Sequence, residues 1–279
     1  MSAILGTIPT TLEDAVRERK CILFVGSGLS VAAGYPSWGD LVLFLVEEAR
    51  KMPHARVNGL DEIIAEKDYG MLAEFARSAL APSQFATLLK QKLGARAKPT
   101  KVHELIASTD YRGLITTNYD RLIETTVTLT RQWQPAIFTP ETMEALAMAL
   151  SNPEFFIFKL HGDVGSIDNI VLTDRDYDRL ILRSPHVRSF LQAVVLTYTL
   201  LFVGYSLRDP DFQLSLRELS LIFEGKTPTH FAMLPDPPDF TIASLLQRLN
   251  IQAIPYSGKD NHREVEDVLA HLSSLRPLS

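Results

Sequence analysis

The sequence predicts an α/β fold, with one doubly wound domain built on a mostly parallel sheet. Segments with helical periodicity alternate with strand-like segments along nearly the whole chain, as they do in parallel α/β proteins. The strand-like segments are continuous apolar runs, which is typical of strands buried on both faces. The chain has 279 residues, of which 46 % are apolar, so it is long and apolar enough to bury a sizeable core.

Short apolar runs that end at glycine or polar residues predict about six buried strands in a Rossmann-like arrangement. The first run, residues 21–25, reads Cys-Ile-Leu-Phe-Val and leads into a glycine turn. A weaker strand is expected at residues 135–138. The other predicted strands cover, in chain order, residues 113–117, 155–160, 200–203, 230–234 and 251–255.

Apolar residues at helical spacing predict helices between these strands. Breaks at Pro53, Gly59 and Pro82 separate several short helices within residues 61–93. We expect these to form a small helical cap, roughly residues 53–98, inserted in a single domain of residues 1–279. Thr173 and Asp176 are spaced as a capping box, with Asp in place of the usual Glu. The other predicted helices cover about 38–51, 101–108, a stretch after residue 120, 141–150, 173–183, 185–197, 239–249 and a last helix with Val265, Val268, Leu269, Leu272 and Leu275 on one face.

Charge and cysteine content narrow the classes of function. Lys and Arg number 28 against 33 Asp and Glu, a net charge of −5, which argues against direct binding of nucleic acid. The single cysteine, Cys21, excludes an internal disulfide and a multi-cysteine zinc site, and the seven histidines are scattered, so we expect no metal. The sequence shows no signal peptide, and the most apolar stretch, 193–205, is too short to span a bilayer. The expected location is the cytoplasm, without a membrane partner.

Polar and glycine residues follow several predicted strands, where open parallel sheets bind their ligands. After the first strand comes Gly26-Ser27-Gly28-Leu29-Ser30. Two close glycines let the backbone approach a diphosphate, although an ordinary tight turn has the same sequence. Val31 stands where the dinucleotide fingerprint of dehydrogenases requires a third glycine, which counts against hydride transfer.

The other strand ends add further candidates. Thr117-Asn118-Tyr119-Asp120 is either part of a site or a helix cap provided by Asp120. His161 is a candidate general base, because the ordinary pKa of histidine suits that role, although a lone histidine is more often structural. Gly204-Tyr205-Ser206 precedes a helix start with Pro210 in its first turn, and the last strand leads to Tyr256. Because all of these lie at strand ends, they can share one cleft, and together they predict a nucleotide site.

These motifs, in this order, resemble the sirtuin superfamily. The Gly-Tyr-Pro-Ser-Trp stretch at 34–38 and the Gly-Tyr-Ser-x-x-Asp-Pro stretch at 204–210 are similar to the SIR2-like domains of bacterial antiphage defence systems. The resemblance spans about residues 20–275. Two features depart from the protein-deacylase branch: residues 161–200 lack the four cysteines of its zinc module, and the loop at 37–40 reads Ser-Trp-Gly-Asp instead of Asp-Phe-Arg.

The resemblance implies an NAD+ glycohydrolase that cleaves the nicotinamide–ribose bond without a metal and acts as an effector of abortive antiviral defence. It implies that Asn118 and His161 are catalytic. The residues it assigns to NAD binding are Gly26, Ser27, Gly28, Ser30, Trp38, Thr117, Asp120, Gly204, Ser206 and Tyr256. Two alternatives remain open: an NAD-dependent protein deacylase or ADP-ribosyltransferase, and a non-catalytic module that senses NAD or ADP-ribose. Expected partners are NAD, a second copy of the chain, and a sensor protein encoded nearby, such as an Argonaute-like protein or a HerA-like ATPase.

Overall fold

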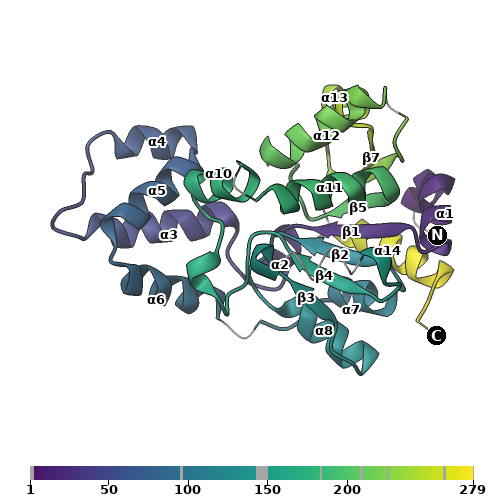
Figure 1. Cartoon of the computed structure of the whole chain (residues 1–279), viewed down its shortest axis with the longest axis horizontal. Coiled ribbons are helices and arrows are strands. Elements are labelled where there is room, and N and C mark those ends of the chain that lie inside the picture. Colours follow the sequence, from purple (N-terminus) through teal and green to yellow (C-terminus); the bar gives the residue numbers. More distant parts are fainter. Residues whose placement is uncertain are drawn as a thin grey trace.

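The protein is an α/β molecule with a single parallel sheet (Figure 1). A computed structural model describes residues 3–94, 97–142, 150–182, 184–207, 210–224, 226–259 and 262–278. Within these ranges seven strands pair in the order β3-β4-β2-β1-β5-β6-β7, and every pairing is parallel. The strands are β1 (Cys21–Val25), β2 (Gly113–Thr116), β3 (Ala136–Phe138), β4 (Phe156–Lys159), β5 (Thr199–Val203), β6 (His230–Pro235) and β7 (Ile251–Tyr256).

The predicted fold class is confirmed, and the strand count differs by one. The additional strand is β3, the weak strand expected at 135–138. It has only three residues, lies at the sheet edge and is largely exposed, although all three residues are apolar. The other six strands are mainly buried.

The central strand β1 lies between β2 and β5, with Val25 opposite both Thr116 and Val203. The chain first builds the sheet from β1 through β2 to β4, and then returns to the other side of β1 with β5. The strand order therefore reverses between β1 and β5. Such a switch point is where doubly wound sheets form a ligand crevice, beyond the carboxyl ends of the strands.

Most predicted helices appear close to their expected bounds. The Thr173–Asp176 capping box is confirmed, because Asp176 N donates to Thr173 Oγ1 (3.2 Å) and Thr173 N donates to Asp176 Oδ2 (3.0 Å). For the helix predicted at 141–150, residues 143–149 lie outside the described residues. The described α-helices are α1 (Thr10–Arg17), α2 (Gly28–Ala32), α3 (Trp38–Arg50), α4 (Leu60–Glu66), α5 (Tyr69–Ala79), α6 (Pro82–Leu93), α7 (Lys101–Ser108), α8 (Leu122–Arg131), α10 (Asp174–Leu182), α11 (Pro185–Thr197), α12 (Pro210–Ile222), α13 (Asp239–Leu249) and α14 (Arg263–Leu275).

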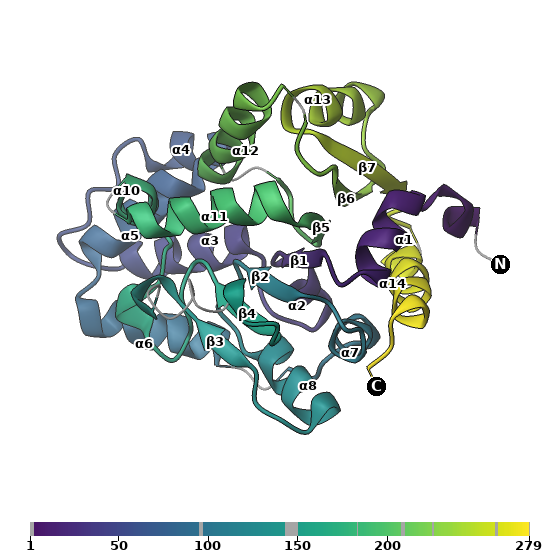
Figure 2. The ribbon, with the colours of Figure 1, turned by 45° about the vertical axis from the view of Figure 1, so that its right-hand side comes forward.

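Helices cover both faces of the sheet (Figure 2). Along β1 the side chains alternate between two cores: Ile22 and Phe24 belong to one, and Cys21, Leu23 and Val25 to the other. The first core includes residues of α10, α11, α12 and α13. The second includes residues of α1, α7, α8 and α14. Burial on both faces explains why β1 is apolar at every position.

Helices α3, α4, α5 and α6 form a lobe at the end of the molecule opposite both termini (Figure 1). They share a third apolar core, which also includes Tyr119, Ile170 and Leu172 from the loops after β2 and β4. The lobe is also tied to α10, where Arg77 pairs with Asp176 at 2.9 Å. The lobe thus packs directly on the loops that leave the carboxyl edge of the sheet.

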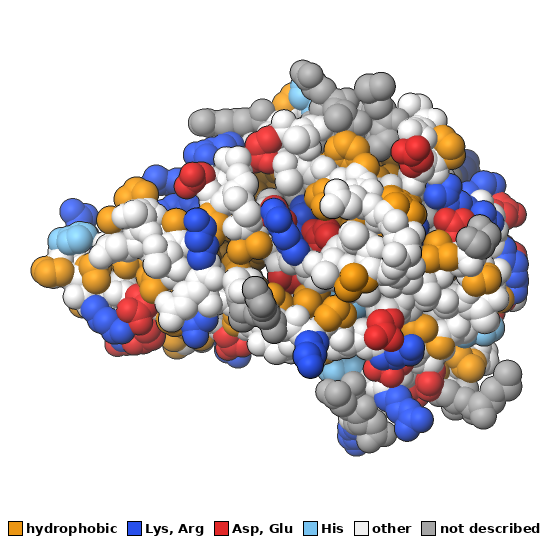
Figure 3. All heavy atoms as spheres, turned by 90° about the horizontal axis from the view of Figure 1, so that it is seen from below, with side chains coloured by type: hydrophobic (Ala, Val, Ile, Leu, Met, Phe, Trp, Pro, Cys, Tyr) orange, Lys and Arg blue, Asp and Glu red, His pale blue; other side chains and the backbone are white. Residues whose placement is uncertain are grey.

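The surface is of mixed charge on the face seen in Figure 3, where acidic and basic side chains are interspersed over the lobe and the body. Among the described helices, none combines the length and apolar character needed to cross a membrane.

Candidate active site

The loops after β1 and β5 touch at the switch point. Gly26 N donates to Val203 O (3.0 Å), and Gly28 N donates to Gly204 O (2.9 Å). A Cβ atom at Gly26 would lie 2.5 Å from Gly204 O, and one at Gly28 would lie 2.9 Å from the same oxygen. These distances leave no room for a side chain at either position. The two glycines therefore permit close packing of two loops, and their N–H groups are already engaged.

Asn118 lies in the loop after β2 and is 5 % exposed. Its side-chain Nδ2 donates to Gly26 O (3.1 Å) and to Ser30 Oγ (2.9 Å). Its backbone N–H donates to Thr116 Oγ1 (3.0 Å), while the neighbouring Thr117 N–H donates to Val25 O (3.3 Å). Among the described residues, the buried Oδ1 atom of Asn118 finds no hydrogen-bond partner. This oxygen is an acceptor for a hydroxyl group or a water molecule, and a buried acceptor is costly to leave unsatisfied.

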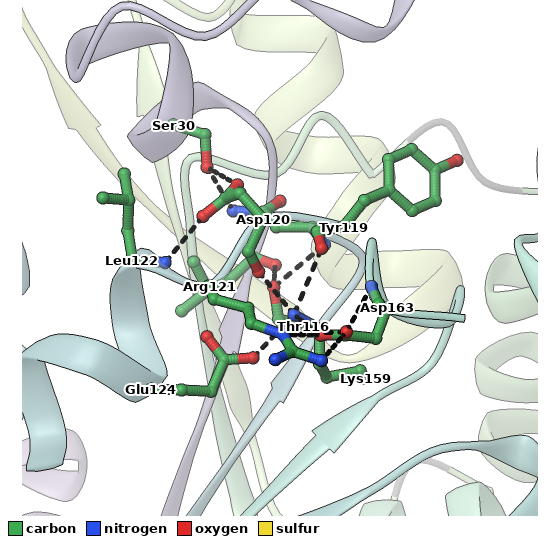
Figure 4. A network of polar contacts seen from close by, with 12 residues as sticks. Ser30, Thr116, Tyr119, Asp120, Arg121, Leu122, Glu124, Lys159 and Asp163 are labelled. Atoms are coloured by element: carbon green, nitrogen blue, oxygen red, sulfur yellow. Dashed lines mark hydrogen bonds and ion pairs between the residues drawn. The ribbon is translucent and has the colours of Figure 1, made fainter. Parts of the chain in front are cut away.

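Asp120 accepts hydrogen bonds with both of its carboxylate oxygens. Its Oδ1 accepts the N–H of Leu122 (3.0 Å), the first residue of α8, whose N-cap position is occupied by Arg121. Its Oδ2 accepts the hydroxyl of Ser30 (2.6 Å). Ser30 in turn accepts from Asn118, so Asp120 orients Asn118 through Ser30 (Figure 4).

His161 leaves the neighbouring strand β4 and is 5 % exposed. Thr116 of β2 pairs with Lys159 of β4, so Asn118 and His161 each lie two residues beyond a matched pair at the same edge. The His161 ring packs edge-on against Tyr177 of α10, with ring centroids 5.0 Å apart. Its carbonyl accepts the N–H of Val171 (3.0 Å). The sheet thus brings the two predicted catalytic residues to adjacent strand ends.

A group of charged side chains lies next to these two loops, of which Lys159, Glu124 and Asp163 are buried and Arg121 is exposed (Figure 4). The side chain of Lys159 is 0 % exposed, and its Nζ contacts Glu124 Oε1 (2.6 Å) and Asp163 Oδ2 (2.9 Å). Arg121 Nε also donates to Asp163 Oδ1 (2.8 Å). Burial raises the pKa of Glu124 above its ordinary value, although Lys159 opposes that shift. For Asp163, burial is outweighed by the hydrogen bonds and charges of Arg121 and Lys159, so its pKa is lowered.

The other predicted NAD-binding residues lie in three different places. Ser27 is half-buried and Ser206 is exposed, each in one of the two contacting loops. Trp38 begins α3 and packs edge-on against Tyr69 of the lobe, with centroids 5.5 Å apart. Tyr256 ends the edge strand β7, where its hydroxyl is 3.0 Å from His262 Nδ1. Two strands, β5 and β6, separate Tyr256 from β1.

Sequence reasoning missed two residues that organise the site. Thr116 Oγ1 donates to Val25 O (3.0 Å) and accepts the Asn118 N–H, which links β1 to the loop after β2. Lys159 is the last residue of β4, whose other residues are apolar. Because a lysine is almost never fully buried unless it is paired, its place in this strand could have indicated a buried ion pair.

At this edge of the sheet, Asn118 Oδ1 is a buried acceptor that has no partner in the part of the chain that the structure describes. Among the described residues, no group of three or more His, Cys, Asp or Glu side chains is placed to hold a metal ion. The predicted absence of a metal requirement stays a prediction.

The sequence model of a family described as SIR2-like domain matches residues 112–254, just over half of the chain. An "NAD(+) hydrolase ThsA" from Bacillus cereus is 26 % identical over 98 % of this chain and 58 % of its own length. A protein of the same name from Enterococcus faecium is 26 % identical over 79 % of this chain and 44 % of its own length. A "Defense-associated sirtuin 2" from Bacillus subtilis is 26 % identical over 81 % of this chain and 22 % of its own length. The chain thus spans about half the length of the two hydrolases.

Proposed function

Because this chain belongs to the SIR2-like domain family, we propose that it is an NAD+ hydrolase that cleaves the nicotinamide–ribose bond. The products are nicotinamide and ADP-ribose. The observation that carries the proposal is the buried Asn118 side chain, whose Nδ2 is engaged by Gly26 and Ser30 and whose Oδ1 has no partner among the described residues. Two relatives named NAD(+) hydrolase support it.

The reaction balances with water as the only co-substrate. The bond between C1′ of the ribose and the pyridinium nitrogen breaks, and its electron pair stays on that nitrogen. Nicotinamide therefore leaves as a neutral molecule and needs no general acid, unlike the leaving group of an ordinary glycoside. Water supplies a hydroxyl group to C1′, and its proton is released.

We assign the proton-handling role to His161 and the positioning role to Asn118. Asn118 Oδ1 accepts a hydrogen bond from the attacking water or from a ribose hydroxyl. His161 accepts the proton as the C1′–O bond forms. We assign the diphosphate and the adenosine ribose to the contacting loops at Gly26 and Gly204, with Ser27 and Ser206 as donors. Gly26 and Gly28 contribute close packing, because their N–H groups are engaged by the loop after β5. Trp38, Thr117 and Tyr256 complete the proposed NAD contacts.

The test is to incubate purified protein with NAD and to identify the products by chromatography and mass spectrometry. Equimolar nicotinamide and ADP-ribose, unchanged by an acetyl-lysine peptide, are expected. Nicotinamide release that requires the peptide, with acetyl transfer to ADP-ribose, would instead identify a deacylase. Saturable NAD binding without turnover under any condition would identify a sensing module.

We further propose that the hydrolase acts in bacterial antiviral defence, as an abortive-infection effector, and that assembly controls it. An unrestrained NAD hydrolase depletes its own host, so the active state must be conditional. Assembly with further copies, or with an Argonaute-like or HerA-like sensor, favours the active state only if that state makes different contacts. The test measures turnover against protein concentration, alone and with the product of the neighbouring gene. Full activity of a dilute monomer would contradict this control.

A further inference from the structure

We propose that Lys159 is a positioning residue: its buried ammonium group fixes the loop that carries Asn118 against the strand end that carries His161. The inference rests on the proposed function, because it concerns the geometry of that reaction. The contacts of the Lys159 ammonium group are with Glu124, Asp163 and the backbone of the loop after β2, so Lys159 acts on Asn118 and His161 indirectly. The contacts that support it are drawn in Figure 4.

The ammonium group of Lys159 contacts three segments of the chain: helix α8, the loop after β4 and the loop after β2. It contacts Glu124 Oε1 on α8 (2.6 Å) and Asp163 Oδ2 in the loop after β4 (2.9 Å). It also donates to the backbone carbonyl oxygen of Asp120, and that of Tyr119 lies 3.4 Å away. The ammonium group is thus paired with two carboxylates and hydrogen-bonded to the backbone of the loop after β2.

The two carbonyls belong to the residues that directly follow Asn118. The same loop is bound to the segment after β4 by a second contact, in which Val164 N donates to Tyr119 O (2.9 Å). On its other side, Asn118 is held by Ser30 and Gly26. Lys159 thus connects the loop that carries Asn118 to the segment that carries His161. We infer that the distance between these two loops depends on this connection.

A purely structural role makes a different prediction. Lys159, Arg121, Glu124 and Asp163 are two cations and two anions, so the group is neutral as a whole. Removal of Lys159 alone leaves an excess buried anion, which destabilises any fold. Removal of the Lys159 and Glu124 charges together, by Lys159→Met with Glu124→Gln, restores neutrality but not the hydrogen bond to Asp120 O. The double variant therefore separates stability from positioning.

The chain offers a matched control at the far end of the same strands. Arg112, directly before β2, is 5 % exposed. It likewise donates to backbone carbonyls, those of Glu154 (2.8 Å) and Asn152 (2.6 Å). Arg112→Met removes a buried cation and its carbonyl contacts from the amino edge of the sheet, where no predicted site residue lies.

The experiment measures melting temperature, kcat, KM for NAD and the affinity for ADP-ribose, under conditions in which the wild type turns over. For the Lys159→Met, Glu124→Gln double variant we expect a melting temperature above that of Lys159→Met. We expect kcat to stay about 10²-fold below wild type, as for a misplacement of about 1 Å. KM and ADP-ribose affinity should change by less than about 3-fold, since the glycine loops are untouched. Arg112→Met should lower the melting temperature and leave kcat unchanged.

Two results would overturn the inference. If kcat of the double variant recovers together with its melting temperature, Lys159 serves stability alone. If kcat falls as much in Arg112→Met as in the double variant, loss of any buried cation lowers kcat, and Lys159 has no specific positioning role. A wild type that binds ADP-ribose but never cleaves NAD would overturn the proposed function, and this inference with it.

Discussion

The Ser30 hydroxyl donates a hydrogen bond of 2.6 Å to Asp120 Oδ2, across 90 positions of sequence. Since the hydroxyl hydrogen is used in this way, the Ser30 oxygen is left to accept Nδ2 of Asn118 at 2.9 Å. The direction of the chain of hydrogen bonds is therefore fixed by the carboxylate at its end. It determines that Asn118 presents its oxygen atom, and not its amide N–H groups, as the free acceptor.

Ser30→Ala should lower kcat about 10-fold and leave the fold intact. The substitution removes one of the two acceptors of Asn118 Nδ2. The other acceptor, Gly26 O, remains and still holds the amide group. The loss is expected at the low end of the cost of a misplaced catalytic group. Steady-state kinetics and a thermal melt would check it. Ser78→Ala on the lobe is the control, because the Ser78 hydroxyl donates to Phe75 O (2.8 Å) within α5. Equal turnover of Ser30→Ala and wild type would refute the orienting role.

Asn118→Ala and His161→Ala should each reduce NAD cleavage by about 10²–10⁴-fold. Each removes a group assigned to water or to its proton, and each lies at a loop position outside the strand core. Circular dichroism and thermal melting establish that the fold persists, and product formation is followed with NAD in excess. Near wild-type turnover in either variant would show that the residue has been wrongly assigned.

Chelators should leave the activity unchanged. The proposed reaction needs no Lewis acid, because the leaving group departs as neutral nicotinamide. Activity is to be compared before and after EDTA treatment and buffer exchange, and after addition of zinc. Loss of activity with the chelator and its return with zinc would contradict the expectation.

The stability of the protein should fall below pH 6.5, in part because of His230. Burial lowers the pKa of His230 to about 4, and its Nδ1 accepts the N–H of Leu200 (3.1 Å) at the start of β5. Between about pH 4 and 6.5 the unfolded chain binds a proton at this residue and the folded chain does not, so stability rises with pH in that window.

His230→Asn removes that titration and keeps an acceptor near Leu200. From pH 7 to pH 5 the wild type should lose about 2 kcal/mol more unfolding free energy than the variant. Urea unfolding at both pH values measures this difference, in which the other titrating groups cancel. Parallel pH profiles for the two proteins would mean that His230 is not a source of acid sensitivity.

Elements defined by local pattern were predictable from the sequence. Strand β1 and helix α7 have the bounds expected for an apolar run and a helical period, and Thr173 with Asp176 forms the expected cap. The strand ends also predicted that the candidate residues share one edge of the sheet, because parallel strands deliver their loops to one side.

The contacts between these loops were not predictable, because they join distant segments. The sequence of the Gly26 loop predicts a phosphate-binding loop. In the structure, however, the N–H groups of Gly26 and Gly28 donate to Val203 O and Gly204 O at the end of β5. Nothing near residue 26 encodes that β5 is the neighbour of β1. In the same way, Lys159 is separated from Glu124 by 35 positions, so the buried ion group appears only when the strands are aligned.

The central position of β1 has a consequence for synthesis. Cys21 pairs with Thr199, 178 positions later in the chain. At a translation rate of about 5–20 residues per second, one edge of this wholly apolar strand waits about 10–35 s for its neighbour. Long-range parallel pairing is also slow in itself. Until residue 199 has been made, residues 21–25 therefore lack one of their two neighbouring strands, and any fragment that stops earlier exposes an aggregation-prone edge.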